Sequence, residues 1–266
     1  MKDSLSLRFL YRTVPGRCIL KLLTARGLSK AAGAFLDSSL SRPLIRPFII
    51  SNHIDLSEYE ACDYKCFNEC FCRKIKAEKR PFDSNPSHLI SPCDGLLSVY
   101  RITDDLIIPV KQSSYSVSSL LQNSQLAQEF NDGWCLVFRL CVNHYHRYCY
   151  PASGRKTKNI FIPGVLHTVR PIALETYPVF TENCREYTIL DTENFGRIVQ
   201  MEAGAMLVGR ICNYHQEKIV SKGEEKGRFE YGGSTIILLL DRNHMPLKEL
   251  LNHNEEIPVK MGMRIQ

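Results

Sequence analysis

The sequence has no apolar run approaching the ~18 residues that a membrane-spanning helix needs. Arginines also interrupt the apolar groups near the N-terminus before the core of a secretory signal can form. Internal repeats and low-complexity tracts are absent too, which argues against solenoid or disordered architectures. We therefore expect one domain, extended by an arm, that can lie on a membrane without spanning it.

The cysteines do not indicate disulfide bonds. There are eleven, an odd number, in a chain without a secretory signal, so we expect reduced thiols and a cytosolic compartment. Cys62, Cys66, Cys70 and Cys72 lie within a segment, Ser57 to Lys79, that is predicted to be helical. The first three would share one helix face, which raises the alternative of a metal cluster. The spacing lacks the close ligand pairs of zinc sites, so we expect buried core thiols and no metal.

Positive charge is concentrated near the N-terminus. Lys and Arg number 34 against 28 Asp and Glu, giving a net charge of +6. From Ser6 to Leu36 apolar residues recur at helical spacing, with breaks at Pro15-Gly16 and Gly27, which predicts two short amphipathic helices. Helices with basic faces either bind an anionic bilayer or pack on the domain. We expect a membrane-associating arm of residues 1–40 on a domain of residues 41–266. The basic residues are Arg8, Arg12, Arg17, Lys21, Arg26 and Lys30.

The rest of the chain reads mainly as short strands. A helix is predicted from Val117 to Phe130 between them. Many short strands separated by turn signals predict an α+β fold with a mostly antiparallel β body. The predicted strands are Leu89–Ile90, Leu96–Tyr100, Leu106–Val110, Trp134–Leu140, Ile160–Ile162, Thr188–Leu190, Arg197–Met201, Met206–Ile211 and Thr235–Leu240.

A double glycine and a serine stand directly before the last of these strands. Gly232 and Gly233 carry no Cβ, so the Gly233 carbonyl is open to attack, and Ser234 Oγ is the nearest nucleophile. Taken alone, this pattern indicates a tight turn into a core strand. Partner motifs elsewhere in the chain change that interpretation.

Three motifs follow one another in a fixed order: Ser91-Pro92-Cys93-Asp94-Gly95, Tyr145-His146-Arg147 and Gly232-Gly233-Ser234-Thr235. In this order and spacing the sequence resembles the phosphatidylserine decarboxylase proenzymes along nearly its whole length. Further matching segments are Phe67 to Pro81 ending in Arg80-Pro81-Phe82, Tyr115-Ser116-Val117, Asn183-Cys184-Arg185-Glu186 and Glu202-Ala203-Gly204-Ala205.

The resemblance implies that the chain cuts itself. Ser234 would attack the Gly233 carbonyl, and β-elimination would then release a large and a small chain that stay together. Ser234 would lose ammonia and become a pyruvoyl group, which forms a Schiff base with the amine of phosphatidylserine and accepts the electrons released as CO₂ leaves. The product would be phosphatidylethanolamine. The resemblance also implies a peripheral protein on the cytoplasmic side of the cell membrane.

Asp94, His146 and Ser234 have the composition of an orienting carboxylate, a base and a nucleophile. His146 is also a candidate proton donor to the substrate. The chain departs from the family at Cys149, where a second histidine is common and is credited with the relay to the serine. The base is therefore open among His146, His167, His144 and a Cys149 thiolate, with His146 the first choice and His167 the second.

Three other functions compete with this one. The Glu202 to Gly209 stretch resembles the hairpins of biotin or lipoate carriers, but no lysine lies in or beside it. A lipid-binding relative that never cleaves itself is an alternative because of Cys149. A pyruvoyl decarboxylase acting on another amine is the third.

Overall fold

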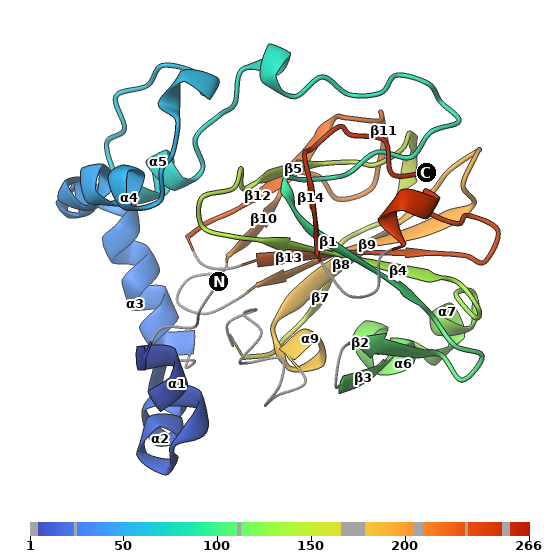
Figure 1. Ribbon diagram of the computed structural model, residues 1–266, viewed down its shortest axis with the longest axis horizontal. Helices are drawn as coiled ribbons and strands as arrows, with labels where there is room; N and C mark the ends of the chain where they lie inside the picture. Colours follow the sequence, from blue (N-terminus) through green and yellow to red (C-terminus); the bar gives the residue numbers. More distant parts are fainter. Residues whose placement is uncertain are drawn as a thin grey trace.

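The computed structural model describes residues 5–23, 26–110, 113–165, 179–204, 210–231, 234–251 and 256–266. A β body forms most of the molecule, and the N-terminal helices extend from one side of it (Figure 1). The predicted α+β class with a mostly antiparallel body is confirmed. Among the described residues, no helix is long and apolar enough to span a membrane.

A nine-stranded sheet within the described residues forms the centre of the body, and its paired strands are antiparallel. β13 lies in its middle, between β9 and β4, and all seven of its residues are buried. The buried strand predicted at Thr235–Leu240 is thus confirmed, and it begins at Ser234. In spatial order the strands are β11 (Lys218–Val220), β6 (Gly154–Lys156), β8 (Arg185–Asp191), β9 (Arg197–Gly204), β13 (Ser234–Leu240), β4 (Trp134–Leu140), β1 (Gly95–Arg101) and β14 (Ile257–Val259), while β7 (Ile160–Ile162) pairs with β8.

Each face of this sheet contributes to its own apolar core, because side chains alternate along β13. Ile236 and Leu238 belong to a core shared with Tyr148 and Phe229 of a three-stranded sheet. Ile237 and Leu239 pack against short helices and a hairpin on the other face. The three-stranded sheet contains β10 (Ile211–Asn213), β12 (Glu225–Phe229) and β5 (Arg147–Cys149), and the hairpin contains β2 (Ile107–Val110) and β3 (Ser113–Ser116).

Two predicted elements near these cores differ in detail. The helix expected from Val117 to Phe130 is divided into α6 (Val117–Leu121) and α7 (Ser124–Gln128). Gln122 has a positive φ, and the Asn123 side chain caps α7 by accepting from the Leu126 N–H at 3.0 Å. Leu89–Ile90 forms only an isolated bridge, and most of the predicted strand Met206–Ile211 lies outside the described residues. The remaining short helices are α9 (Val179–Glu182) and η4 (Lys248–Leu250).

The N-terminal arm contains three helices where two were predicted. Pro15 lies in the first turn of the second helix, a position that tolerates proline because no N–H bond is needed there. The prediction of a helix break at Pro15-Gly16 was therefore wrong, and the first helix ends at Arg12 instead. The helices are α1 (Leu5–Arg12), α2 (Val14–Leu23) and α3 (Arg26–Asp37), followed by η1 (Ser39–Leu44) and α4 (Ile45–Ser51).

The helix predicted from Ser57 to Lys79 is wrong. Most of this segment is irregular, because residues at its two ends pair with each other: the Glu60 N–H donates to Lys74 O and the Lys76 N–H donates to Glu58 O. Among its cysteines, Cys62 is exposed and the other three are buried. Its helical pieces are η2 (Leu56–Glu58), α5 (Phe67–Phe71) and η3 (Ala77–Lys79).

Candidate functional site

The start of β13, the end of β4 and the start of β1 meet at one edge of the large sheet. Arg139 of β4 pairs with both Thr235 and Leu96, so the residues before these two lie at the same level. Asp94 directly precedes β1 and Ser234 opens β13, two strands away. Because neighbouring strands lie about 4.7–4.9 Å apart, the two backbones are about 10 Å apart.

Ser234 is fully buried, and its Oγ has no hydrogen-bond partner among the described residues. By strand alternation its side chain lies on the same face as Ile236, toward the three-stranded sheet. A buried hydroxyl without a partner costs free energy, and such groups in native proteins call for a functional explanation. Gly232 and Gly233, the predicted cleavage site, lie outside the described residues.

His146 is also fully buried and lies at the end of the facing sheet, just before β5. Its Nδ1 is 2.9 Å from the His144 carbonyl oxygen. A carbonyl can only accept, so Nδ1 carries the proton. Nε2 has no partner among the described residues and is left as a proton acceptor. Burial, and then the nearby charge of Arg73, lower the pKa of His146 to about 3, so the ring is neutral.

The chain brings His146 and Ser234 to the same end of the core between the sheets. The Phe229 N–H, at the end of β12, donates to the His146 carbonyl at 2.9 Å. From Phe229 the chain crosses to the large sheet and enters β13 at Ser234. Phe71 packs between the two segments, with ring centroids 4.1 Å from His146 and 5.2 Å from Tyr231.

Asp94 does not orient His146, contrary to the sequence-based expectation. Its carboxylate accepts from Arg80 Nε at 2.8 Å and Nη2 at 2.6 Å, and from the Met261 N–H at 2.9 Å. Its charge acts on His144, whose pKa is lowered by burial and partly restored by Asp94. The partner of the His146 Nδ1 proton is a backbone carbonyl instead.

The other candidates for the base are Cys149, His144 and His167. Cys149 is buried in β5, and burial raises the pKa of its thiol to about 12, so it is not a thiolate at neutral pH. His144 Nδ1 accepts from the Cys141 N–H at 3.1 Å. His167 lies outside the described residues.

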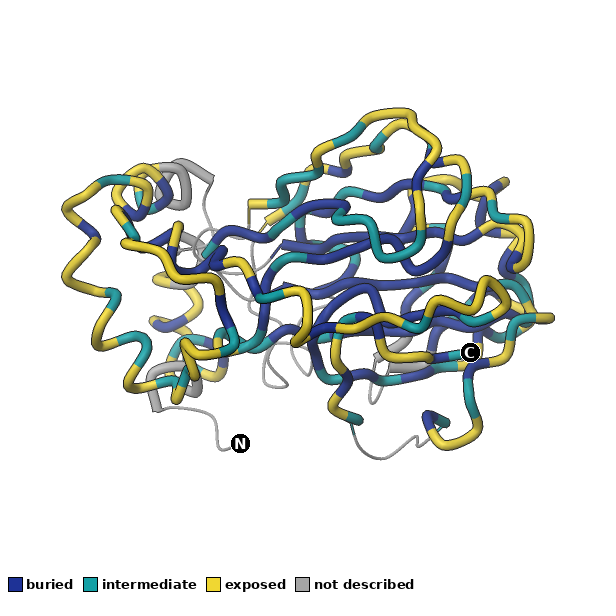
Figure 2. The backbone as a smooth tube through the Cα atoms, turned by 90° about the horizontal axis from the view of Figure 1, so that it is seen from above, coloured by how far each residue is buried: buried dark blue, intermediate teal, exposed yellow. Residues whose placement is uncertain are grey.

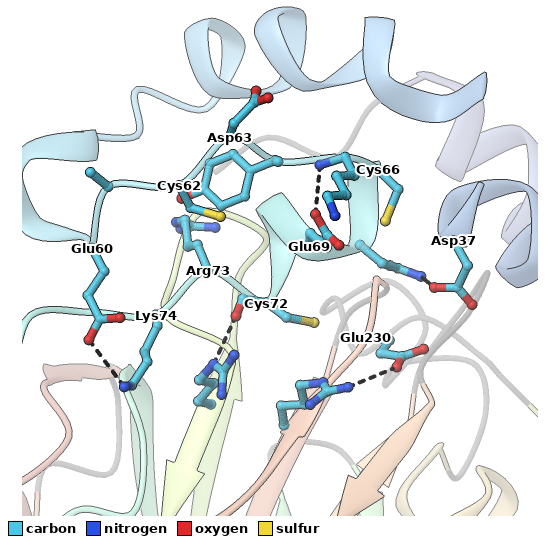
Figure 3. A pocket seen from close by; sticks show the side chains of 16 residues that line it. Asp37, Glu60, Cys62, Asp63, Cys66, Glu69, Cys72, Arg73, Lys74 and Glu230 are labelled. Atoms are coloured by element: carbon cyan, nitrogen blue, oxygen red, sulfur yellow. Dashed lines mark hydrogen bonds and ion pairs between the residues drawn. The ribbon is translucent and has the colours of Figure 1, made fainter. Parts of the chain in front are cut away.

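A cavity of about 710 Å³ lies between the segment of residues 60–74 and the strands β5 and β12 (Figure 3). Its wall carries both signs of charge, and several of these groups are paired: Lys74 with Glu60 at 3.2 Å, and Arg228 with Glu230 at 3.8 Å. The wall is therefore polar and close to electrically balanced. Its charged residues are Asp37, Glu60, Asp63, Lys65, Glu69, Arg73, Lys74, Arg147, Arg228 and Glu230.

Sequence reasoning missed two arginines at the site. Arg80 belongs to a matching motif but was given no role, and Arg73 was not singled out at all. Arg73 directly follows Cys72, the last cysteine of the segment predicted to be helical. Its partners Asn143 and His144 are 70 and 71 residues away in the sequence. A single sequence carries no signal of such a contact.

Comparison with known proteins agrees with the resemblance. Residues 67–266 match the family described as phosphatidylserine decarboxylase. The chain is similar to phosphatidylserine decarboxylase proenzyme 2 of Clostridium acetobutylicum, with 46% identity over 264 residues, 97% of this chain and 90% of the relative. The proenzymes of Clostridium botulinum and Ruminiclostridium cellulolyticum are each 40% identical over 249 residues, 91% of this chain and 84% and 83% of those relatives.

These matches define the class of the protein as a carboxy-lyase made as a proenzyme. The chain belongs to the phosphatidylserine decarboxylase family.

Proposed function

We propose that this chain decarboxylates phosphatidylserine to phosphatidylethanolamine and CO₂, after cutting itself between Gly233 and Ser234. The observation that carries the proposal is the buried Oγ of Ser234, which has no partner among the described residues, together with membership of the family. An orphaned hydroxyl at the start of a central strand fits a residue that is consumed to make a pyruvoyl group.

We assign the base for self-cleavage to His146. Its neutral ring, with the proton on Nδ1, leaves Nε2 to take the proton of Ser234 Oγ. The Oγ–carbon bond to Gly233 forms and the Gly233–Ser234 amide bond breaks, giving an ester. Removal of the Ser234 Cα proton then breaks the Cβ–Oγ bond, so that the Gly233 carboxylate leaves, and water replaces the nitrogen as ammonia.

The pyruvoyl group would supply the electron-poor carbonyl that draws electrons from the departing carboxylate. The protein's own residues would shape the site around it. Phe71 and Tyr231 exclude water on the side of His146. His146 is also our candidate for the donor to the substrate carbon, through Nε2 once that nitrogen has taken up a proton. The polar cavity beside Arg73 suits a headgroup that carries both signs of charge.

Activity tests this proposal directly. Purified protein incubated with phosphatidylserine labelled in the serine carboxyl is expected to release labelled CO₂, and hydroxylamine should abolish release by trapping the carbonyl. Release that hydroxylamine leaves untouched would exclude the pyruvoyl mechanism. Cleaved protein that releases nothing would indicate another amine substrate, and a chain that stays whole would indicate the non-cleaving lipid-binding relative.

We further propose that residues 1–40 form the arm that holds the enzyme at an anionic bilayer, on the cytoplasmic side of the cell membrane. Large apolar side chains of the arm are exposed, which is unusual unless another surface covers them. They include Phe9 at 44%, Val14 at 67% and Ile19 at 47% exposure, and most of the arm residues whose burial Figure 2 colours are exposed or intermediate. The arm is anchored at its far end, where Leu36 packs on Phe67.

Removing residues 1–25 is therefore expected to weaken binding to vesicles that contain an anionic lipid by at least about tenfold, since exposed apolar groups and basic charges both contribute. Co-sedimentation measures this. Because α3 and its contact through Leu36 remain, self-cleavage should continue. Salt should weaken binding of the full chain. Unchanged co-sedimentation after truncation would show that the arm is structural.

A further inference from the structure

Arg73 is a buried cation without a carboxylate partner. It is 2% exposed, and none of the described carboxylates forms an ion pair with it. Its guanidinium lies 4.4 Å over the ring of Tyr59, and Nη2 also bonds the Tyr59 hydroxyl at 3.1 Å. A buried charge is costly unless it is paired, so its retention calls for a reason.

Two further hydrogen bonds connect Arg73 with the backbone next to His146. Nη2 donates to the carbonyls of Asn143 and His144, at 3.1 and 3.3 Å. The His144 carbonyl is also the acceptor of the His146 Nδ1 proton. The His144 carbonyl oxygen thus accepts hydrogen bonds from both the Arg73 guanidinium and the His146 imidazole.

Arg185 shows what a purely structural buried arginine looks like in this chain. It is 1% exposed and bonds only backbone carbonyls, four in all: Leu120, Thr181, Asn183 and Ser119. Each of its nitrogens has a partner. Arg73 differs, because its Nε has none among the described residues and its bonds to Cys70 and Phe71 are long, both 3.4 Å.

We propose that Arg73 is a positioning residue for His146. By holding the His144 carbonyl it fixes the proton on Nδ1, and its charge adds to burial in keeping the ring neutral, so that Nε2 is free to take the proton of Ser234. The His144 carbonyl, held by Arg73, thus orients the imidazole as the carboxylate does in a serine–histidine–aspartate triad. This inference rests on the proposed self-cleavage.

The charges around His146 support this role. Among the groups that act on its titration, Arg73 and His144 both disfavour the protonated ring, and the only favourable contribution is the bond to the His144 carbonyl. The Asp94 carboxylate is paired with Arg80 rather than with His146. Without the positive charge of residue 73, the pKa of His146 should rise, while burial still holds it below its ordinary value.

The experiment compares Arg73→Gln and Arg73→Lys with Arg185→Gln as the control for loss of a buried arginine. Each precursor is made by cell-free translation, and cleavage is followed on denaturing gels between about pH 5 and about pH 8. In the wild type the rate should not depend on His146 titration, because the ring stays neutral. In Arg73→Gln cleavage should be at least about tenfold slower at pH 7 and should slow further as the pH falls.

Arg73→Lys keeps the charge but not the forked geometry, so its cleavage should be slower without the new acid sensitivity. Arg185→Gln should lower the melting temperature and leave the pH profile unchanged. If Arg73→Gln has the same pH profile as Arg185→Gln, the inference is overturned. If Arg73→Gln fails to fold, wild-type cleavage rate in Arg73→Lys overturns it.

A spectroscopic measurement separates this inference from the function on which it rests. In the Ser234→Ala background, NMR titration of His146, assigned with His146→Gln, should show a higher pKa when Arg73→Gln is added. An unchanged pKa would reject the role of Arg73 even if self-cleavage is real. A wild-type chain that never cleaves would instead reject the proposed function.

Discussion

Ser234→Ala is expected to leave one intact chain, whereas the wild type separates on a denaturing gel into residues 1–233 and 234–266. The substitution removes the hydroxyl at the first residue of the central strand, so no ester can form. Decarboxylation should fall to background. Intact mass gives the decisive reading, because the small wild-type piece should be lighter by one ammonia than a chain that begins with serine.

Thr235→Val is the matched control. Thr235 is as buried as Ser234, its Oγ1 also has no partner among the described residues, and it points to the opposite face of the sheet. Replacing it by an isosteric apolar residue should leave cleavage intact and stability equal or higher. A serine N-terminus on the small wild-type piece would mean ordinary proteolysis. Cleavage of Ser234→Ala at the same bond would mean the same.

Asp94→Asn should strongly destabilise the protein. The side chains of Arg80 and Asp94 are 5% and 10% exposed, and removing one charge of a buried pair costs about 3–5 kcal/mol. We expect a lower melting temperature and a loss of matured protein. Chemical denaturation of the uncleaved Ser234→Ala chain, with and without Asp94→Asn, measures the free energy of unfolding free of any change in cleavage.

The double variant Asp94→Leu and Arg80→Met separates two reasons for the loss. With both charges absent, neither member of this pair is left as an unpaired buried charge, so most of the stability should return. If maturation returns with it, Asp94 serves only to hold Arg80 and the Met261 backbone. If a stable double variant remains uncleaved, Asp94 has a direct part in the chemistry.

The sequence predicted the elements whose own residues determine their structure, such as the central buried strand. The run from Ile236 to Leu240 is apolar without a break, as expected of a strand buried on both faces, and β13 is such a strand. The helix predicted around the cysteines is wrong because cysteines spaced by four residues also occur outside helices. The backbone at the two ends of that segment forms hydrogen bonds across a loop instead of within a helix.

The sequence indicated which residues belong to the candidate site, but not which hydrogen bonds they form. Ser234 and His146 are both buried with an unpartnered polar atom among the described residues, and a catalytic contact between them stays a prediction. The partner of Asp94 was not predictable, because a carboxylate near a turn is chemically free to bind an arginine or a histidine. That choice is made by the packing of Arg80, and the single sequence carries no record of it.

The central place of β13 has a consequence for the life of the mature protein. Residues 234–266 supply β13, bonded on both sides by β9 and β4, and β14 at the edge. Once the proposed cut is made, unfolding releases two molecules, so the midpoint of unfolding of the mature protein should depend on its concentration while that of the precursor does not. Refolding would require a second-order encounter of two chains. The active lifetime of the mature enzyme would then be determined by its unfolding rate, because the unfolded chains do not readily reassemble.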